Sequence, residues 1–154
     1  RLLRSDEKQF VFGLEKREKR MLLEVLKHYP MVPASYAGLS SGVTPPGLES
    51  SRQLLEEALA AHREENRKAL EAMLQEEGRF REVKDGLELA LGREQMEWLI
   101  QVLNDIRVGS WVLAGSPGGK EDEPLVWSVK TPRLVWLMEA SGFFEMALLD
   151  ALAS

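Results

Sequence analysis

The chain has 154 residues, of which 44% are hydrophobic and 29% charged, and its 20 basic and 25 acidic side chains give a formal charge of -5. This length suits one globular helical domain, residues 1–154, whose core needs neither disulfides nor a metal. The absence of cysteine excludes a disulfide framework, a thiolate zinc finger, an iron–sulfur cluster and a cysteine nucleophile.

Location and broad partner class follow from the same numbers. No apolar run approaches the roughly 18 residues of a membrane-spanning helix, and no apolar signal core follows the first charges. A nucleic-acid-binding domain is expected to have a pI above about 9, whereas the sequence pI is about 5.2. We therefore expect a cytoplasmic protein that binds neither membrane nor nucleic acid.

The N-terminal part predicts a short strand followed by a helix. Phe10, Val11 and Phe12 are aromatic or β-branched and precede a glycine, which is typical of a strand. Apolar side chains with helical spacing over residues 15–29 predict the first helix, which Pro30 would end.

A long second helix is predicted over residues 50–77. Ser50 and Gln53 have the spacing of a capping box, and Gly78 marks the end. Residues 62–68 are almost wholly polar, so this stretch should cross solvent or meet a polar neighbour.

A strand over residues 87–91 has two candidate partners. It follows the turn dipeptide Asp85-Gly86 and has alternating leucines. Residues 80–84 could pair with it as a hairpin. Alternatively, it could pair with residues 10–12, because each of these two strands is followed at once by a long helix. We favour this second pairing, which gives a two-stranded sheet.

Two further helices complete the predicted fold. One runs from Arg93 to about Ala114 with Gly92 as its N-cap, and the other begins at Thr131-Pro132 and continues through Gly142. The fold class is thus mainly α: a helical bundle of about four helices with a small two-stranded β-sheet.

Residues 29–48 are unusual because they contain no charge, four prolines and three glycines. Loops this long are uncommon in compact domains and are usually functional or disordered. Their apolar side chains argue against disorder, so we expect the first half to be packed on the domain.

Two short segments match catalytic or phosphate-binding patterns in letters only. Residues 38–42 match the G-x-S-x-G pattern, and residues 115–120 resemble a phosphate-binding loop. Neither segment has the flanking sequence that its motif requires.

Two carboxylate–imidazole pairs could bind a metal if they met across the bundle. Glu24 and His28 are four residues apart, and His62 and Glu65 are three apart. Carboxylate-bridged di-iron bundles use Glu-x-x-His on two helices, a pattern missing here. Surface ion pairs and hydrogen bonds are the favoured interpretation, and we expect no metal and no cofactor.

A cluster of polar side chains lies within the otherwise apolar helix predicted from Arg93 to about Ala114, which is the third helix of the chain. Asn104, Arg107 and Trp111 lie at i, i+3 and i+7 and therefore share one face. If half-buried, these side chains need hydrogen-bonding partners. We expect them to tie the helix to the loop around Tyr36, or else to form a site for a ligand or partner. The basic cluster of residues 16–20 is interpreted as a solvated helix face.

Two segments resemble a known family. Residues 103–107 (LNDIR), which follow residues 93–99 (REQMEWL), resemble the "EEQAEAWLRALNDLRLAL" segment of a bacterial family of uncharacterised helical proteins, best known in actinobacteria. Residues 31–36 (MVPASY) are similar to its "LLP-x-AY" element. The resemblance implies the same order of strands and helices over most of the chain. It implies no activity, but the family's genes often lie near that of an adaptor for regulated proteolysis, which suggests a regulatory role.

The favoured function is a non-enzymatic interaction or regulatory module, because no catalytic constellation is found. Its predicted contact surface is formed by Tyr36, Asn104, Arg107 and Trp111. A first alternative is a small-molecule or metal-binding enzyme in the helical bundle. A second is a homo-oligomeric protein that associates through apolar positions of the last helix.

Overall fold

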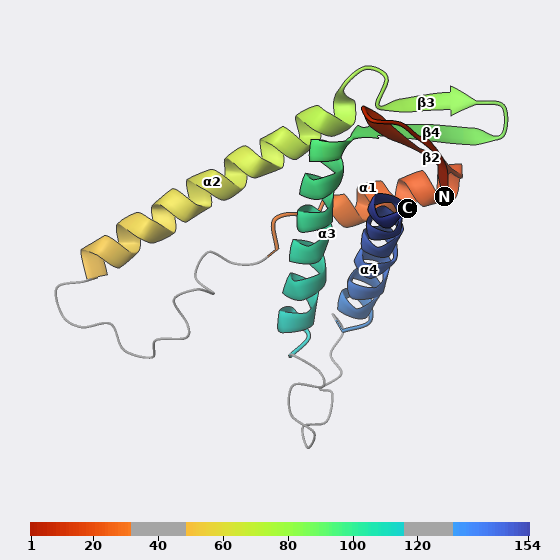
Figure 1. Ribbon diagram of the computed structural model, residues 1–154. Helices are drawn as coiled ribbons and strands as arrows, with labels where there is room; N and C mark the ends of the chain where they lie inside the picture. The colour runs from red at the N-terminus through yellow and green to blue at the C-terminus, as the bar shows by residue number, and fades with distance from the viewer. Residues whose placement is uncertain (32–48, 116–130) are drawn as a thin grey trace.

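The computed structural model describes residues 1–31, 49–115 and 131–154 (Figure 1). These residues form four strands and four helices, and in chain order they are β1 (Leu2–Ser5), β2 (Gln9–Leu14), α1 (Lys16–Leu26), α2 (Glu49–Gln75), β3 (Phe80–Val83), β4 (Gly86–Gly92), α3 (Arg93–Leu113) and α4 (Thr131–Ala153). The mainly α prediction is confirmed.

The sheet corrects the predicted two-stranded one. It has four antiparallel strands in the order β1-β2-β4-β3, so β4 pairs with β2 on one side and with β3 on the other. Both candidate pairings of residues 87–91 therefore occur together. The prediction was wrong because a central strand offers two edges of hydrogen-bonding groups. It also missed β1, a mostly exposed strand without apolar alternation.

The core lies between the sheet and three helices. Alternate residues of β2 and β4 are buried on the helical side of the sheet: Phe10, Phe12, Leu14, Leu87, Leu89 and Leu91. They pack with buried residues of α1, α3 and α4 in one hydrophobic cluster. The sheet lies across one end of α3 and α4, which run antiparallel side by side (Figure 1).

Helix α2 joins this core only near its C-terminal end. Leu70 and Met73 are buried, while the N-terminal half projects away from the sheet and the other helices (Figure 1). Leu54 and Leu55 in that half are 66% and 59% exposed. The predicted apolar stripe of this helix is thus buried at one end and exposed at the other.

A buried guanidinium holds the end of α2 in place. The Arg79 Nε donates to the Met73 carbonyl oxygen at 3.0 Å, and Nη1 donates to the Ala90 carbonyl oxygen and, at 2.8 Å, to Gln95 Oε1. Its Nη2 donates to Glu76 Oε2 at 2.9 Å. A buried charge is tolerated when it is paired and hydrogen-bonded. Arg79 therefore connects α2 to the central strand and to the start of α3.

Charged side chains cover part of the opposite face of the sheet. Arg4 of β1 donates two hydrogen bonds to Glu88 of β4, at 3.2 and 3.0 Å, and Arg81 of β3 donates a third at 2.6 Å. These bonds, led by the one from Arg4, hold the pKa of Glu88 below its ordinary value. Gly13 lies opposite Glu88 in the register. A Cβ at Gly13 would lie 3.1 Å from the Leu3 side chain, so this glycine leaves room for Leu3.

Candidate functional site

The predicted polar group of α3 is satisfied within the protein. Arg107 Nη2 donates to Asn104 Oδ1 at 2.8 Å, and Arg107 Nε donates to Glu145 Oε2 of α4 at 3.1 Å. The Arg107 side chain passes close to Gly142, where a Cβ would make ordinary van der Waals contact with the Arg107 Cδ at 3.6 Å. Asn104 and Arg107 therefore connect α3 to α4.

The predicted surface also includes Trp111 and Tyr36. Trp111 is half-buried one turn further along α3. Tyr36 lies outside the described residues, as do the G-x-S-x-G pattern and all but the first residue of the phosphate-loop-like segment. The predicted contact surface stays a prediction where it depends on Tyr36.

The backbone that leaves α1 is held by hydrogen bonds from α2 and α3. The Met31 N–H donates to Asp105 Oδ2 at 2.7 Å, and Arg63 Nη2 donates to the Pro30 carbonyl oxygen at 2.8 Å. The Asn66 side chain hydrogen-bonds the Tyr29 hydroxyl, while burial raises the pKa of that tyrosine. The polar middle of α2 thus meets a polar neighbour, the backbone after α1. An acid within an apolar helix, Asp105, was the available signal.

The four candidate metal ligands do not form a site. Arg133 Nη2 donates to Glu24 Oε1 at 3.1 Å and lies 3.0 Å from His28 Nε2. His62 and Glu65 are exposed on α2. Within residues 1–31, 49–115 and 131–154, no three His, Asp or Glu side chains are grouped to hold a metal ion.

These contacts shift the pKa values of Glu24 and His28. Hydrogen bonds from Lys27 and then Arg133 lower the pKa of Glu24. Burial lowers the pKa of His28, and the positive charge of Arg133 adds to this effect. The pair therefore forms a surface ion-pair network that joins α1 to α4, as the favoured interpretation expected.

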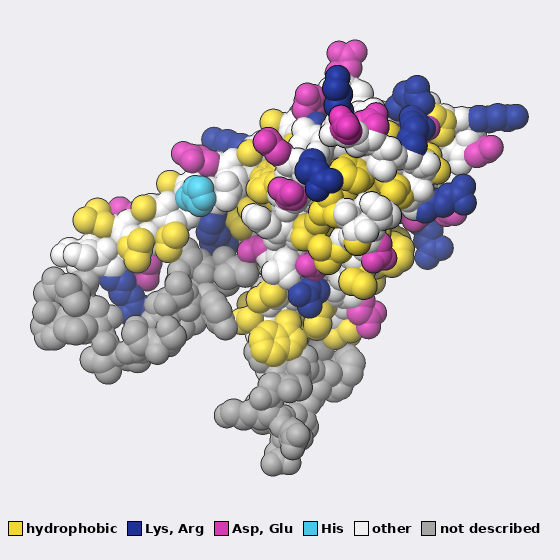
Figure 2. Space-filling model, viewed as in Figure 1, with side chains coloured by type: hydrophobic (Ala, Val, Ile, Leu, Met, Phe, Trp, Pro, Cys, Tyr) yellow, Lys and Arg dark blue, Asp and Glu magenta, His cyan; other side chains and the backbone are white. Residues whose placement is uncertain are grey.

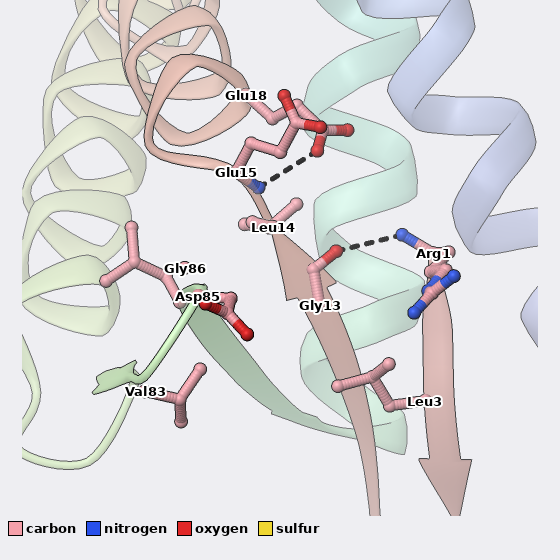
Figure 3. A pocket seen from close by; sticks show the side chains of 10 residues that line it. Arg1, Leu3, Gly13, Leu14, Glu15, Glu18, Val83, Asp85 and Gly86 are labelled. Carbon is pink, nitrogen blue, oxygen red and sulfur yellow. Dashed lines mark hydrogen bonds between the residues drawn. The ribbon is translucent and has the colours of Figure 1, made fainter.

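A hollow of about 500 Å³ lies where β2 leads into α1, beside the β3–β4 turn (Figure 3). Leu3 and Val83 face each other across it, and Glu15, Glu18 and Asp85 supply carboxylates. Glu18 is already used to cap α1, since its Oε1 accepts from the Glu15 N–H at 2.9 Å. The described lining has no histidine, serine or lysine.

Among the described helices, α4 has the most large apolar side chains exposed to solvent. Four large side chains point away from the core, namely Trp136, Phe143, Met146 and Leu149, and we call them the α4 outer face. Phe143 and Met146 are each 58% exposed. The inner face of the same helix is buried, including Leu137, Phe144 and Leu148. Helix α4 is thus apolar on both sides.

Hydrophobic side chains gather over α3 and α4 in Figure 2, whereas Lys, Arg, Asp and Glu side chains gather over the sheet. A helix that is apolar all round is normally buried, and exposed apolar patches commonly mark contact sites. None of the described helices is both long enough and apolar enough to cross a membrane.

Comparisons with known proteins add no family. No family model, curated protein or solved structure matches the chain. The resemblance to the actinobacterial helical family therefore stays a prediction.

Proposed function

We propose that the protein is a non-enzymatic interaction module and that the α4 outer face is its contact surface. The exposure of Phe143 and Met146 on a helix whose opposite side is already buried carries this proposal. Arg107 bonds to Asn104 and to Glu145. Among residues 1–31, 49–115 and 131–154, none of the buried core residues covers the exposed side chains of α4, so we move the expected contact from the third helix to α4.

The spacing along α4 supports a helix as the partner. Residues 136, 139, 143, 146, 150 and 153 are separated alternately by three and four positions, and all are exposed. This is the spacing of a coiled-coil seam, where one helix packs its side chains between those of another. The centre of the seam is apolar, with Phe143 and Met146, and its ends are more polar.

We take a second copy of the chain as the partner, because an apolar seam centred on Phe143 and Met146 is self-complementary when two α4 helices run antiparallel. The proposed assembly is therefore a symmetric dimer in which each copy contributes the same face.

Light scattering after size-exclusion chromatography tests the dimer. The monomer mass is 17.4 kDa, and we expect the wild-type protein to give twice this value. Phe143→Glu should give the monomer mass, because a carboxylate would be buried without a partner in the seam. Leu55→Glu is the matched control, since Leu55 is 59% exposed on α2 and should leave the dimer intact. A monomer at every concentration would contradict the second copy as partner.

A photo-crosslinking amino acid distinguishes self-association from another partner. Placed at position 143, it should give a defined adduct in cells, and at position 55 it should not. An adduct of a second protein would replace the dimer while keeping the interaction module. The absence of any adduct specific to position 143 would contradict the module itself.

A further inference from the structure

The Arg133 side chain joins the start of α4 to the end of α1. Its Nη2 donates to Glu24 Oε1 at 3.1 Å and lies 3.0 Å from His28 Nε2. Glu24 lies in the last turn of α1, and half-buried His28 follows shortly after the helix ends at Leu26. Arg133 lies in the first turn of α4. One guanidinium therefore contacts both a carboxylate and an imidazole across this junction.

The contact with Arg133 requires one protonation state of the His28 ring. A guanidinium carries only hydrogen-bond donors, and a ring nitrogen of histidine accepts only when it has no proton. His28 Nε2 must therefore accept from Arg133 Nη2, which requires the neutral ring with its proton on Nδ1. A protonated ring has no acceptor and would place a second positive charge beside the guanidinium. The contact is thus possible only while His28 is neutral.

The other charges around His28 also oppose its protonation. Among the described residues, the charges that act on the ring are those of Arg133 from α4 and of Glu24 and Lys27 from α1. Glu24 is the only carboxylate of the three, and it already accepts from Lys27 at 3.3 Å and from Arg133. An imidazolium at position 28 would therefore have to share one carboxylate with two other cations.

The neighbouring helices α2 and α3 place their charges on the backbone that follows His28. Arg63 of α2 donates to the Pro30 carbonyl oxygen, and Asp105 of α3 accepts from the Met31 N–H. These bonds hold the chain just after His28 but leave the ring to Arg133. The response of this junction to acid therefore depends on the His28 ring itself.

We propose that His28 is a pH-sensitive contact between α1 and α4, whose protonation in mildly acidic solution breaks the bond to Arg133 and loosens the first turn of α4. The imidazolium then competes with Arg133 for Glu24, which lies four positions before it, a spacing at which helical side chains meet. Both effects move Arg133 away from the end of α1. This proposal is independent of the α4 outer face.

The direction of the pH response follows from the surroundings of the ring. Burial, and then the positive charge of Arg133, lower the pKa of His28 in the folded protein. As the pH falls below about 6.5, the ordinary histidine pKa, the unfolded chain takes up this proton before the folded chain does. The folded state therefore loses stability over this interval, at a higher pH than the protonation of Glu88.

NMR on the wild-type protein tests the contact. The His28 ring and the backbone amides of residues 133–136 are followed from about pH 8 to about pH 5, the interval in which histidine titrates. We expect the ring to titrate below about 6.5. The amides of residues 133–136 should shift with the same midpoint, because the first turn of α4 responds to the charge of the ring.

Two variants assign the response to its partners. His28→Gln, which keeps a hydrogen-bond acceptor but does not titrate, should abolish the shift of the amides. Arg133→Met should move the midpoint of the His28 ring upward, because a cation is removed and Glu24 becomes free to pair with the imidazolium. His62→Gln is the matched control, since His62 is exposed on α2, and it should leave both titrations unchanged.

Three results would overturn the proposal. One is a set of amides at residues 133–136 that does not follow the midpoint of His28, and another is an unchanged amide shift in His28→Gln. The third is a midpoint of the His28 ring above about 6.5. The first and third are measured on the wild-type protein, so they do not depend on the folding of any variant.

Discussion

Helices α2 and α3 are both long, and both were predicted from an apolar stripe, yet they meet the rest of the protein differently. Most of the stripe of α3 is buried, with Met96 and Ile106 both 0% exposed, and only its last turn opens to solvent, where Leu113 is 55% exposed. In the N-terminal half of α2, by contrast, Leu55 is 59% exposed. Periodicity therefore predicts that a helix forms, but the neighbouring elements decide how much of its stripe is buried.

The connections of the two helices explain the difference. Helix α3 continues directly from the central strand β4, since Gly92 is both the last residue of the strand and the N-cap of the helix. Its apolar face is thus held against the sheet from the first turn. Helix α2 reaches the sheet only at its C-terminal end, where Arg79 connects it to β4.

The largest loss of stability is expected from a substitution on the buried face of α3. Leu103 is fully buried, so Leu103→Ala should lower the free energy of unfolding by about 2–5 kcal/mol, through lost transfer energy and the cavity left behind. Urea denaturation followed by circular dichroism measures this change. A loss as small as that of an exposed leucine would remove the contrast between the two helices.

A smaller loss is expected when the connection of α2 to the sheet is cut. Arg79→Met keeps an apolar stem but leaves the Ala90 and Met73 carbonyl oxygens without this donor, which should lower the free energy of unfolding by about 1–3 kcal/mol. Hydrogen exchange should also become faster in α2 than in α3. The control is Arg17→Met, an exposed cation of α1, and equal exchange in both helices would contradict the role of Arg79.

The charged face of the sheet should make the stability of the protein depend on pH, unlike its apolar face. Because the folded pKa of Glu88 is lowered, its ion pairs stabilise the protein at neutral pH, and this contribution is lost as the pH falls below about 4. The Tm of Glu88→Gln should therefore fall less between neutral and acidic pH than that of the wild-type protein. Parallel Tm curves for the two proteins would show that Glu88 contributes nothing to the acid sensitivity.

The smallest effect is expected at the exposed end of α2. Leu55→Ala should change the free energy of unfolding by no more than about 0.5 kcal/mol, as is usual for surface positions. The same urea titration measures it. A loss comparable to that of Leu103→Ala would mean that Leu55 is covered in solution, and the two helices would then be equivalent.

The helices were predictable because each carries its own boundary signals. Helix α3 was expected over residues 93–114 and runs from Arg93 to Leu113, and α4 continues through Gly142 as its apolar spacing indicated. The sheet was only half predicted. Strand pairing depends on which edges meet in space, and neither β1 nor the double pairing of β4 leaves a local pattern.

The contacts of the candidate site were likewise not predictable from local sequence patterns. The spacing on α3 placed Asn104 and Arg107 on one face, where they bond to each other, but spacing within one helix cannot identify Glu145 of another helix as a partner of Arg107. Spacing likewise could not place Arg133 of α4 beside Glu24 and His28. The exposed side of α4 was anticipated only as apolar positions in excess of what one core can bury.

The outer strands of the sheet have a consequence for assembly. Strand β3 has four residues and carries Arg81 and Glu82, and β1 carries Arg4, so both edges present charges. Short strands and charged side chains hinder edge-to-edge addition of further strands. The two edge strands therefore disfavour association of several copies through their sheets.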